Sequence, residues 1–212
     1  MIQANLDKLQ TVLCLGAHSD DIEIGCGATI LKLVRERPGL EVWWVVFTAD
    51  GKRSAEAKNS ARAFLKGAGK SQVIIQQFRN GYFPFEGALI KNFFESLKSR
   101  VNPDLVFTHF RNDRHQDHRL VSDLTWNTFR NHLVLEYEIP KYDGDLSSPN
   151  CFVQISESVA SEKVENLCKY FFTQSNKHWF DRDTFLALMR LRGMESCTQY
   201  AEAFYSRKMV CA

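Results

Sequence analysis

Short apolar runs alternate with segments of helical periodicity through the first two thirds of the chain, and this alternation restricts the fold more than any other feature. Residues 42–47 (VWWVVF) form an apolar run with almost no polar alternation, which indicates a strand covered on both faces, as in a parallel sheet. Residues 22–35 carry apolar side chains three or four positions apart, which is typical of a helix. Strands are expected at 11–15, 42–47, 73–77 and 105–108, and helices at 22–35, 54–65 and 89–97.

Strands that alternate with helices are usually joined by right-handed crossovers in a mostly parallel sheet. The sequence therefore predicts an α/β fold, a Rossmann-like, doubly wound sheet with helices on both faces. The later pattern is weaker, with helical character up to about residue 132, a further strand at 133–137 and a turn-rich break at 142–150. Helices are expected again at 157–171 and 182–191. Because this last third is too short to fold convincingly alone, we expect a single domain over residues 1–212.

Composition and charge argue against several classes of protein. The chain has 212 residues, with 27 Lys and Arg against 25 Asp and Glu, and its net charge of +2 leaves no dense basic surface for nucleic acid. No signal-type or membrane-spanning apolar stretch is seen, so we expect a cytoplasmic protein without membrane insertion. Six scattered cysteines without a C-x-x-C pair favour reduced thiols. A homo-oligomer stays open, since an edge strand or the C-terminal aromatics could form an interface.

Two segments rich in histidine and aspartate follow the first and fourth expected strands. The first is GAHSDD at 16–21, and the second is HFRNDRHQDH at 109–118. In a doubly wound sheet, ligands bind outside the carboxyl ends of the strands, where the strand order reverses. Because the first and fourth strands flank that point in a Rossmann-like order, we expect the two segments to face one cleft.

The residue types in these segments fit a catalytic zinc site, in which three imidazole or carboxylate ligands leave a fourth position for water. His18, Asp21 and His118 would supply such a set. Asp20, next to a ligand, could accept a proton from water, and His115, one helical turn before His118, could face the substrate. The two aspartates could instead cap the following helix, and an H-x-x-H alone is a weak signal. The two segments together favour a site.

Three other interpretations concern the same regions. Two histidines and one carboxylate also form the facial triad of non-haem iron oxygenases, although those enzymes normally have β-rich scaffolds. Gly25 and Gly27 invite a dinucleotide-binding interpretation, but they lie within the helical pattern and lack the third glycine of that motif. Residues 78–85 (FRNGYFPF) form an aromatic, turn-prone loop that could stack a sugar ring or pack in the core.

The segment AHSDDIEIGCG resembles the AHPDD-x-x-x-G-x-G signature of the PIG-L/LmbE-type metal-dependent N-deacetylases, and RHQDH resembles the H-P-D-H or H-x-D-H motif of that family. Residues 53–57 fit its R-x-x-E-A, and 162–174 look like its K-x-x-A-L…S-Q helix. The RG…YAEAF ending at 192–204 is similar to that of bacterial members associated with sugar and surface-polysaccharide pathways. The sequence departs from the motifs at Ser19 and Gln116, where the family has or often has proline.

Carried over position by position, the resemblance implies a role for each matching residue. The positions are His18, Asp21 and His118 for the metal ligands, Asp20 for the general base, His115 for the histidine that assists at the carbonyl oxygen and leaving amine, Asp117 for the aspartate paired with that histidine, and Arg53 for a substrate contact.

The activity implied is Zn²⁺-dependent hydrolysis of the acetamide of an N-acetylated amino sugar, which is free, glycosidic or linked to a nucleotide. Acetate and a free amine would be released, and Fe²⁺ is the alternative metal. The expected partner is thus a small N-acetylated sugar or sugar nucleotide. A rival from another class is a sugar-nucleotide or glycan binding module that has lost catalysis, although all five catalytic positions hold competent residue types. The sequence leaves the particular substrate open.

Overall fold

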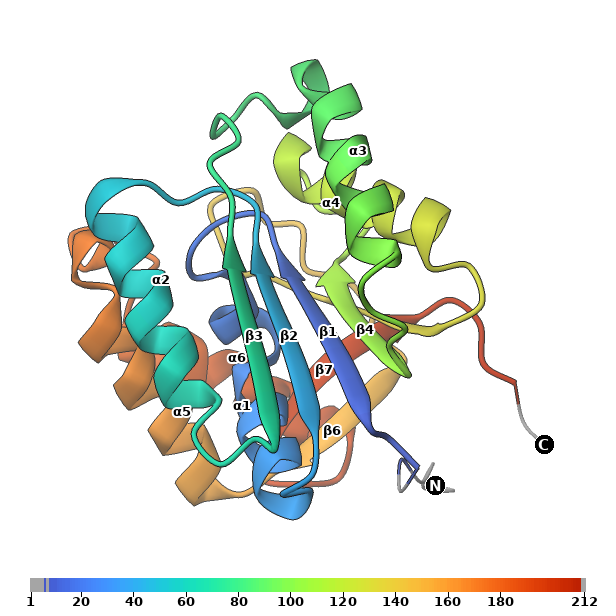
Figure 1. Cartoon of the computed structure of the whole chain (residues 1–212). Helices are drawn as coiled ribbons and strands as arrows, with labels where there is room; N and C mark the ends of the chain where they lie inside the picture. Colours follow the sequence, from blue (N-terminus) through green and yellow to red (C-terminus); the bar gives the residue numbers. More distant parts are fainter. Residues whose placement is uncertain (1–5, 7, 211–212) are drawn as a thin grey trace.

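One seven-stranded sheet forms the centre of the computed structural model, which describes residue 6 and residues 8–210 (Figure 1). The strand order is β3-β2-β1-β4-β5-β7-β6. The strands are β1 (Thr11–Gly16), β2 (Glu41–Val46), β3 (Lys70–Ile75), β4 (Leu105–His109), β5 (Leu133–Tyr137), β6 (Cys151–Ile155) and β7 (Tyr200–Ser206). The helices are α1 (Asp21–Glu36), α2 (Gly51–Phe64), α3 (Gly87–Lys98), α4 (Gln116–Thr128), α5 (Glu157–Tyr170) and α6 (Arg182–Glu195), with 3-10 helices at Phe83–Phe85 and Phe172–Gln174.

The strands from β3 to β5 in the sheet order are all parallel, whereas β7 and β6 at the other edge are antiparallel to their neighbours. This arrangement confirms the predicted Rossmann-like, mostly parallel α/β sheet. The two antiparallel strands were not expected from the sequence. The edge strand β6 is mostly half-buried, since it has a neighbouring strand on one side only.

Helices cover both faces of the sheet, as predicted. Helices α1, α2, α5 and α6 pack on one face, and α3 and α4 cover the other (Figure 1). Successive side chains of β1 alternate between the two cores: Val12 and Cys14 belong to the core under α1, and Leu13 and Leu15 to the core under α3 and α4. None of the described helices is long and apolar enough to span a membrane.

Helix α1 is buried along almost its whole length, and two glycines make this possible. A Cβ atom on Gly25 would lie 2.1 Å from Cδ2 of Tyr137, and one on Gly27 would lie 2.7 Å from Cε1 of Phe64. Such distances are far below van der Waals contact, so only glycine lets α1 approach β5 and α2 this closely. The spacing of the two glycines therefore has a packing cause.

The loops after β1 and β4 leave the sheet side by side. The two strands are parallel neighbours, with Val12 opposite Leu105, and β2 lies on the other side of β1. The order of the strands thus reverses between β1 and β4, which is where ligands bind in doubly wound sheets. This pairing brings together the two histidine-rich segments of the sequence.

Candidate functional site

Three side-chain atoms predicted as metal ligands converge at the carboxyl ends of β1 and β4. The Nδ1 atom of His18 lies 3.1 Å from Nε2 of His118 and 3.2 Å from Oδ2 of Asp21, and the last two atoms are 3.5 Å apart. Ligand atoms about 2.0–2.2 Å from a tetrahedral zinc ion lie roughly 3.3–3.6 Å from one another. The size of this triangle and its donor types therefore fit a zinc-sized ion.

The starts of α1 and α4 place these side chains. Asp21 is the first residue of α1, and its Oδ2 accepts the backbone N–H of His18 at 2.6 Å. His115 is the N-cap of α4, and His118 follows in its first turn. Asp20, at the N-cap of α1, makes no capping hydrogen bond with its side chain. Capping alone thus does not account for the two aspartates.

A buried carboxylate behind His118 fixes the orientation of its ring. Nδ1 of His118 lies 2.9 Å from Oδ2 of Asp113, and the same oxygen accepts from Nζ of Lys141 at 2.9 Å. Burial, together with the neighbouring His109, lowers the pKa of His118 to about 3, against the opposing effect of the carboxylates. The ring is neutral, with its proton on Nδ1 toward Asp113, which leaves the Nε2 lone pair for a ligand bond.

His18 lies between two carboxylates. Its Nε2 atom is 3.3 Å from Oδ2 of Asp117, on the opposite side of the ring from Asp21. Burial acts to lower the pKa of His18, but Asp21 and Asp117 outweigh it and raise this pKa to about 10. A field that holds a proton this firmly is also one that attracts a divalent cation, whose binding releases the proton.

Arg53, predicted to contact the substrate, lies beside Asp20 and Ser19. Its guanidinium donates to Oδ1 of Asp20 at 2.8 Å and to Oγ of Ser19, the residue that replaces proline in the resembled motif. Burial raises the pKa of Asp20, while the charge of Arg53 opposes that rise. The departure at Ser19 therefore supplies an acceptor that holds Arg53 beside Asp20.

The structure differs from the expected pairing of Asp117 with His115. The Asp117 carboxylate accepts from the backbone N–H groups of Gly81 and Phe83, at 2.7 and 3.2 Å, and lies against His18. Its contact with His115 is through the backbone, where the Asp117 N–H donates to Nδ1 of His115 at 3.2 Å. The two side chains are two positions apart in a helical first turn, so they point in different directions. Asp117 instead ties the loop after β3 to His18.

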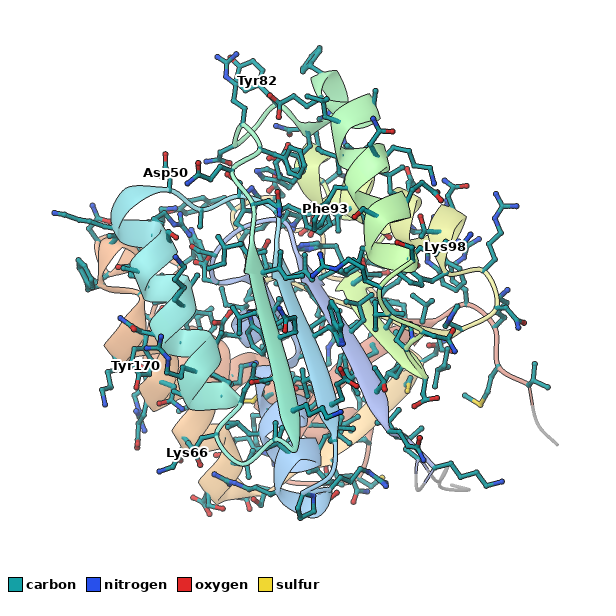
Figure 2. The ribbon with its side chains drawn as sticks, viewed as in Figure 1. Asp50, Lys66, Tyr82, Phe93, Lys98 and Tyr170 are labelled. Atoms are coloured by element: carbon teal, nitrogen blue, oxygen red, sulfur yellow. The ribbon has the colours of Figure 1, made fainter. Side chains whose placement is uncertain are left out.

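The loop after β3 is a wall of the site. Gly81, whose φ of +79° suits glycine, accepts from the Gln116 side chain at 3.1 Å, so this second departure from the motif also has a contact. Within the aromatic segment 78–85, Phe83 is buried and its ring stacks on His18, with centroids 6.2 Å apart. Tyr82 stands at the outer tip of the loop (Figure 2). The segment thus serves partly as core and partly as an exposed rim.

His109, the last residue of β4, was not assigned a role from the sequence. It is fully buried, its ring stacks on His118 with centroids 3.9 Å apart, and its Nε2 lies 3.2 Å from Oδ2 of Asp21. Asp21, His109 and His118 form one group of donor atoms that could hold a metal, and His18, His115 and His118 form another. The backbone N–H of Ala17 already donates to Nε2 of His109 at 2.9 Å, which favours His18 as the ligand. The sequence signal that could have found His109 is its position directly after the fourth expected strand, which lies beside the first.

Two sequence comparisons place this geometry in a family. The profile of the PIG-L family, described as GlcNAc-PI de-N-acetylase, matches residues 13–129, more than half of the chain. A protein of Escherichia coli K12 named "Uncharacterized deacetylase YaiS" is 29% identical over 180 residues, which cover 79% of this chain and 94% of that protein.

Solved structures share the fold over almost the whole chain. N,N'-diacetylchitobiose deacetylase from Pyrococcus horikoshii has a TM-score of 0.73 at 21% identity, covering 94% of this chain and 84% of that one. A conserved protein from Thermus thermophilus has a TM-score of 0.75 at 21% identity, covering 96% and 97%. GalB, the 4-carboxy-2-hydroxymuconate hydratase of Pseudomonas putida, has a TM-score of 0.73 at 16% identity, covering 96% and 98%. These structures share the fold, and the profile match over more than half of the sequence shows that the chain belongs to the PIG-L family.

Proposed function

We propose that this protein is a metal-dependent deacetylase that hydrolyses the acetamide of an N-acetylated amino sugar, releasing acetate and a free amine. The observation that carries the proposal is the triangle of His18, Asp21 and His118 with the Asp20 carboxylate beside it. The family description and the names of relatives, which include deacetylases of diacetylchitobiose and teicoplanin, support an acetamide on a sugar. The substrate would be a free, glycosidic or nucleotide-linked amino sugar in the cytoplasm.

The metal is proposed to be Zn²⁺, with Fe²⁺ as the alternative, held by His18 Nδ1, Asp21 Oδ2 and His118 Nε2. A metal there would polarise the acetamide carbonyl and lower the pKa of a bound water. Asp113 supports this role from behind, because its carboxylate orients the His118 ring and raises its basicity.

Asp20 would act as the general base and then as the acid. Its carboxylate accepts a proton from the attacking water as the water oxygen bonds to the carbonyl carbon. When the carbon–nitrogen bond breaks, the same carboxyl returns that proton to the nitrogen. Arg53, 2.8 Å away, opposes the rise that burial causes in the pKa of Asp20 and so favours the ionised carboxylate that the first step needs.

His115 would stabilise the oxygen that becomes negative. Because Nδ1 of His115 accepts the Asp117 N–H, the ring proton is on Nε2, and burial lowers the pKa of this histidine so that the ring is neutral. A neutral ring still donates one N–H to the carbonyl oxygen, and such donors matter most where charge develops. In this proposal the backbone N–H of Asp117, and not its carboxylate, orients the His115 ring.

Acetate release tests the proposal directly. The substrates are N-acetylated hexosamines, their nucleotide diphosphate forms and an N-acetylated glycoside, each assayed with zinc, with ferrous iron under anaerobic conditions, and after chelation. Metal-dependent release from one class would support the activity and name the substrate. Bound metal without release from any substrate would contradict it, and ligand binding without turnover would favour the binding module. A hydratase activity, as in the neighbour GalB, would show as loss of a carbon–carbon double bond.

Two variants separate metal binding from proton transfer. Asp20→Asn is expected to retain stoichiometric metal and to lower kcat by about 100-fold or more, since a general base contributes that much. The exposed Asp123→Asn on α4 is its matched control. His118→Ala is expected to lose bound metal, whereas the exposed His178→Ala keeps it. Wild-type turnover by Asp20→Asn would remove Asp20 from the mechanism, and full zinc occupancy in His118→Ala would remove His118 from the ligand set.

A further inference from the structure

A buried ion pair outside the site lies against the middle of α1. Nζ of Lys163, on α5, is 2.6 Å from Oε1 of Glu202, on β7, and each side chain is 3% exposed. Neither residue contacts the candidate ligands in any described interaction, and the proposed mechanism does not use them. Both come from the last third of the chain, where β7 runs antiparallel to its neighbours β5 and β6.

The pair is inserted into one turn of the helix. Glu202 accepts the backbone N–H groups of Ala28 and Thr29 at 2.9 and 2.6 Å, and Lys163 donates to the backbone carbonyl of Ile24 at 2.6 Å. In a regular α-helix the Ala28 N–H would donate to that same Ile24 carbonyl. The carboxylate and the ammonium thus bond to two backbone groups that are partners of each other in a regular helix. Side chains that insert into the hydrogen-bond pattern of a helix can change the direction of its axis.

The segment of α1 before the inserted pair carries the acid residues of the site. Within it, the Ile24 N–H donates to the Asp20 carbonyl at 3.0 Å, which closes a regular first turn that contains Asp21. This turn begins at the metal triangle and ends at the carbonyl that Lys163 holds. Its direction therefore depends on the pair as well as on the loop after β1.

We propose that Lys163 and Glu202 are positioning residues, which set the direction of the first turn of α1 and so place Asp20 and Asp21. The inference rests on the proposed function, because that function assigns the two aspartates their roles. A buried ion pair is often no more stabilising than apolar side chains of similar volume. Here the pair instead gives hydrogen bonds of a defined direction to three backbone groups, which apolar side chains do not.

A double variant separates position from stability. Lys163→Met with Glu202→Leu removes both charges and the side-chain hydrogen bonds to Ile24, Ala28 and Thr29, which leaves these backbone groups to the regular helical pairing. We expect a melting temperature close to that of the wild type, because such replacements are often neutral or stabilising. We expect kcat to fall by about 10- to 100-fold, as for small displacements of catalytic groups. The visible absorption spectrum of the bound Co²⁺ form should shift, since Asp21 is a ligand.

The control removes the charge of a carboxylate that also accepts two backbone N–H groups, at the amino ends of the central strands β1 and β4 and away from the site. Asp104 accepts the N–H groups of Gln10 and Thr11, each at 2.8 Å, before β1 and β4 begin. Asp104→Asn should lower the melting temperature without changing kcat or the Co²⁺ spectrum. If the double variant does not fold, Glu202→Asp replaces it, because it keeps the charge but withdraws the carboxylate by one methylene.

The outcomes are distinct. Unchanged kcat and Co²⁺ spectrum in a folded double variant, or in Glu202→Asp, would overturn the positioning role. A shifted spectrum with the melting temperature retained would support it, since a purely structural pair would change stability alone. If the wild type releases no acetate, the proposed function fails, and the Co²⁺ spectrum still decides whether the pair positions Asp21.

Discussion

The two segments that meet at the candidate metal centre are held in place in different ways. The rings of the two histidines on α4 are oriented by residues close to them in sequence, since Asp113 orients His118 from five residues away and the Asp117 N–H bonds to His115. The start of α1 is held by contacts that reach it from α2, α5 and β7. The orientation of these histidines is thus set mainly by local contacts, whereas the carboxylate side depends on elements far apart in the sequence.

Gly25→Ala is the most severe test of that dependence. The new Cβ would lie 2.1 Å from the buried Tyr137 ring, whose hydroxyl is anchored to the Leu15 carbonyl at 2.6 Å, so the ring cannot yield easily. We expect a loss of about 3 kcal/mol in the free energy of unfolding, measured by urea denaturation. Gly39→Ala, with no atom within 4 Å of the new Cβ, should change it by less than about 0.5 kcal/mol. Equal effects of the two variants would show that α1 is not closely packed.

Asp113→Asn tests the local contact that orients His118. The amide still accepts from Nδ1 of His118 but carries no charge, so the ring becomes a weaker donor to a metal. Loss of such a supporting partner is expected to weaken metal affinity by about 10- to 100-fold, measured by competition with a chelator. In the metal-free protein, Asp113→Asn should lower the melting temperature by less than Gly25→Ala does. A large loss of fold stability with unchanged metal affinity would contradict the comparison.

The smallest expected effect is the pH dependence that Glu23 gives to the free energy of unfolding. This residue of α1 is fully buried, and its carboxyl oxygens have no hydrogen-bond partner among the described residues. Burial raises its pKa well above the usual 4.5, and the nearby Ser60 hydroxyl opposes only part of that rise. A raised pKa means that the folded state binds the proton more tightly, so its stabilising contribution is present below about pH 4.5 and is lost as pH rises through the raised pKa.

The measurement compares metal-free wild type with Glu23→Gln by urea unfolding at several pH values. Relative to the variant, the wild type should lose stability as pH rises, by at most about 1.4 kcal/mol per pH unit. Glu36→Gln, at the exposed end of the same helix, should show no such slope. Parallel curves for wild type and Glu23→Gln would mean that water or a hydrogen-bond donor reaches this carboxyl.

The parts of the fold that the sequence predicted are those with strong local patterns. Continuous apolar runs such as residues 42–47 mark strands buried on both faces, and the topology rule for parallel sheets then places the loops after β1 and β4 together. From this, His18, Asp21 and His118 could be predicted to meet, and in the structure they do. Their roles as ligands stay a prediction.

The remaining features depend on contacts that no local pattern contains. Strands β6 and β7 pair antiparallel, so the strand–helix alternation that predicts a parallel sheet does not indicate them. His109 belongs to the site only because β4 lies beside β1. The Asp117 carboxylate turns toward His18 because the loop after β3 offers it two N–H groups. Spacing along the chain does not predict these side-chain directions.

The contact between Glu202 and α1 also affects when the site can be completed during synthesis of the chain. The carboxylate lies 174 residues after Ala28, and a chain that grows at roughly 5–20 residues per second needs roughly 10–35 s to cover that distance. During this interval the Ala28 and Thr29 N–H groups lack the carboxylate that bonds to them in the folded chain. They gain it only when β7 enters the sheet between β5 and β6. The carboxylate side of the site is therefore completed by a segment that is synthesised long after the site's own residues.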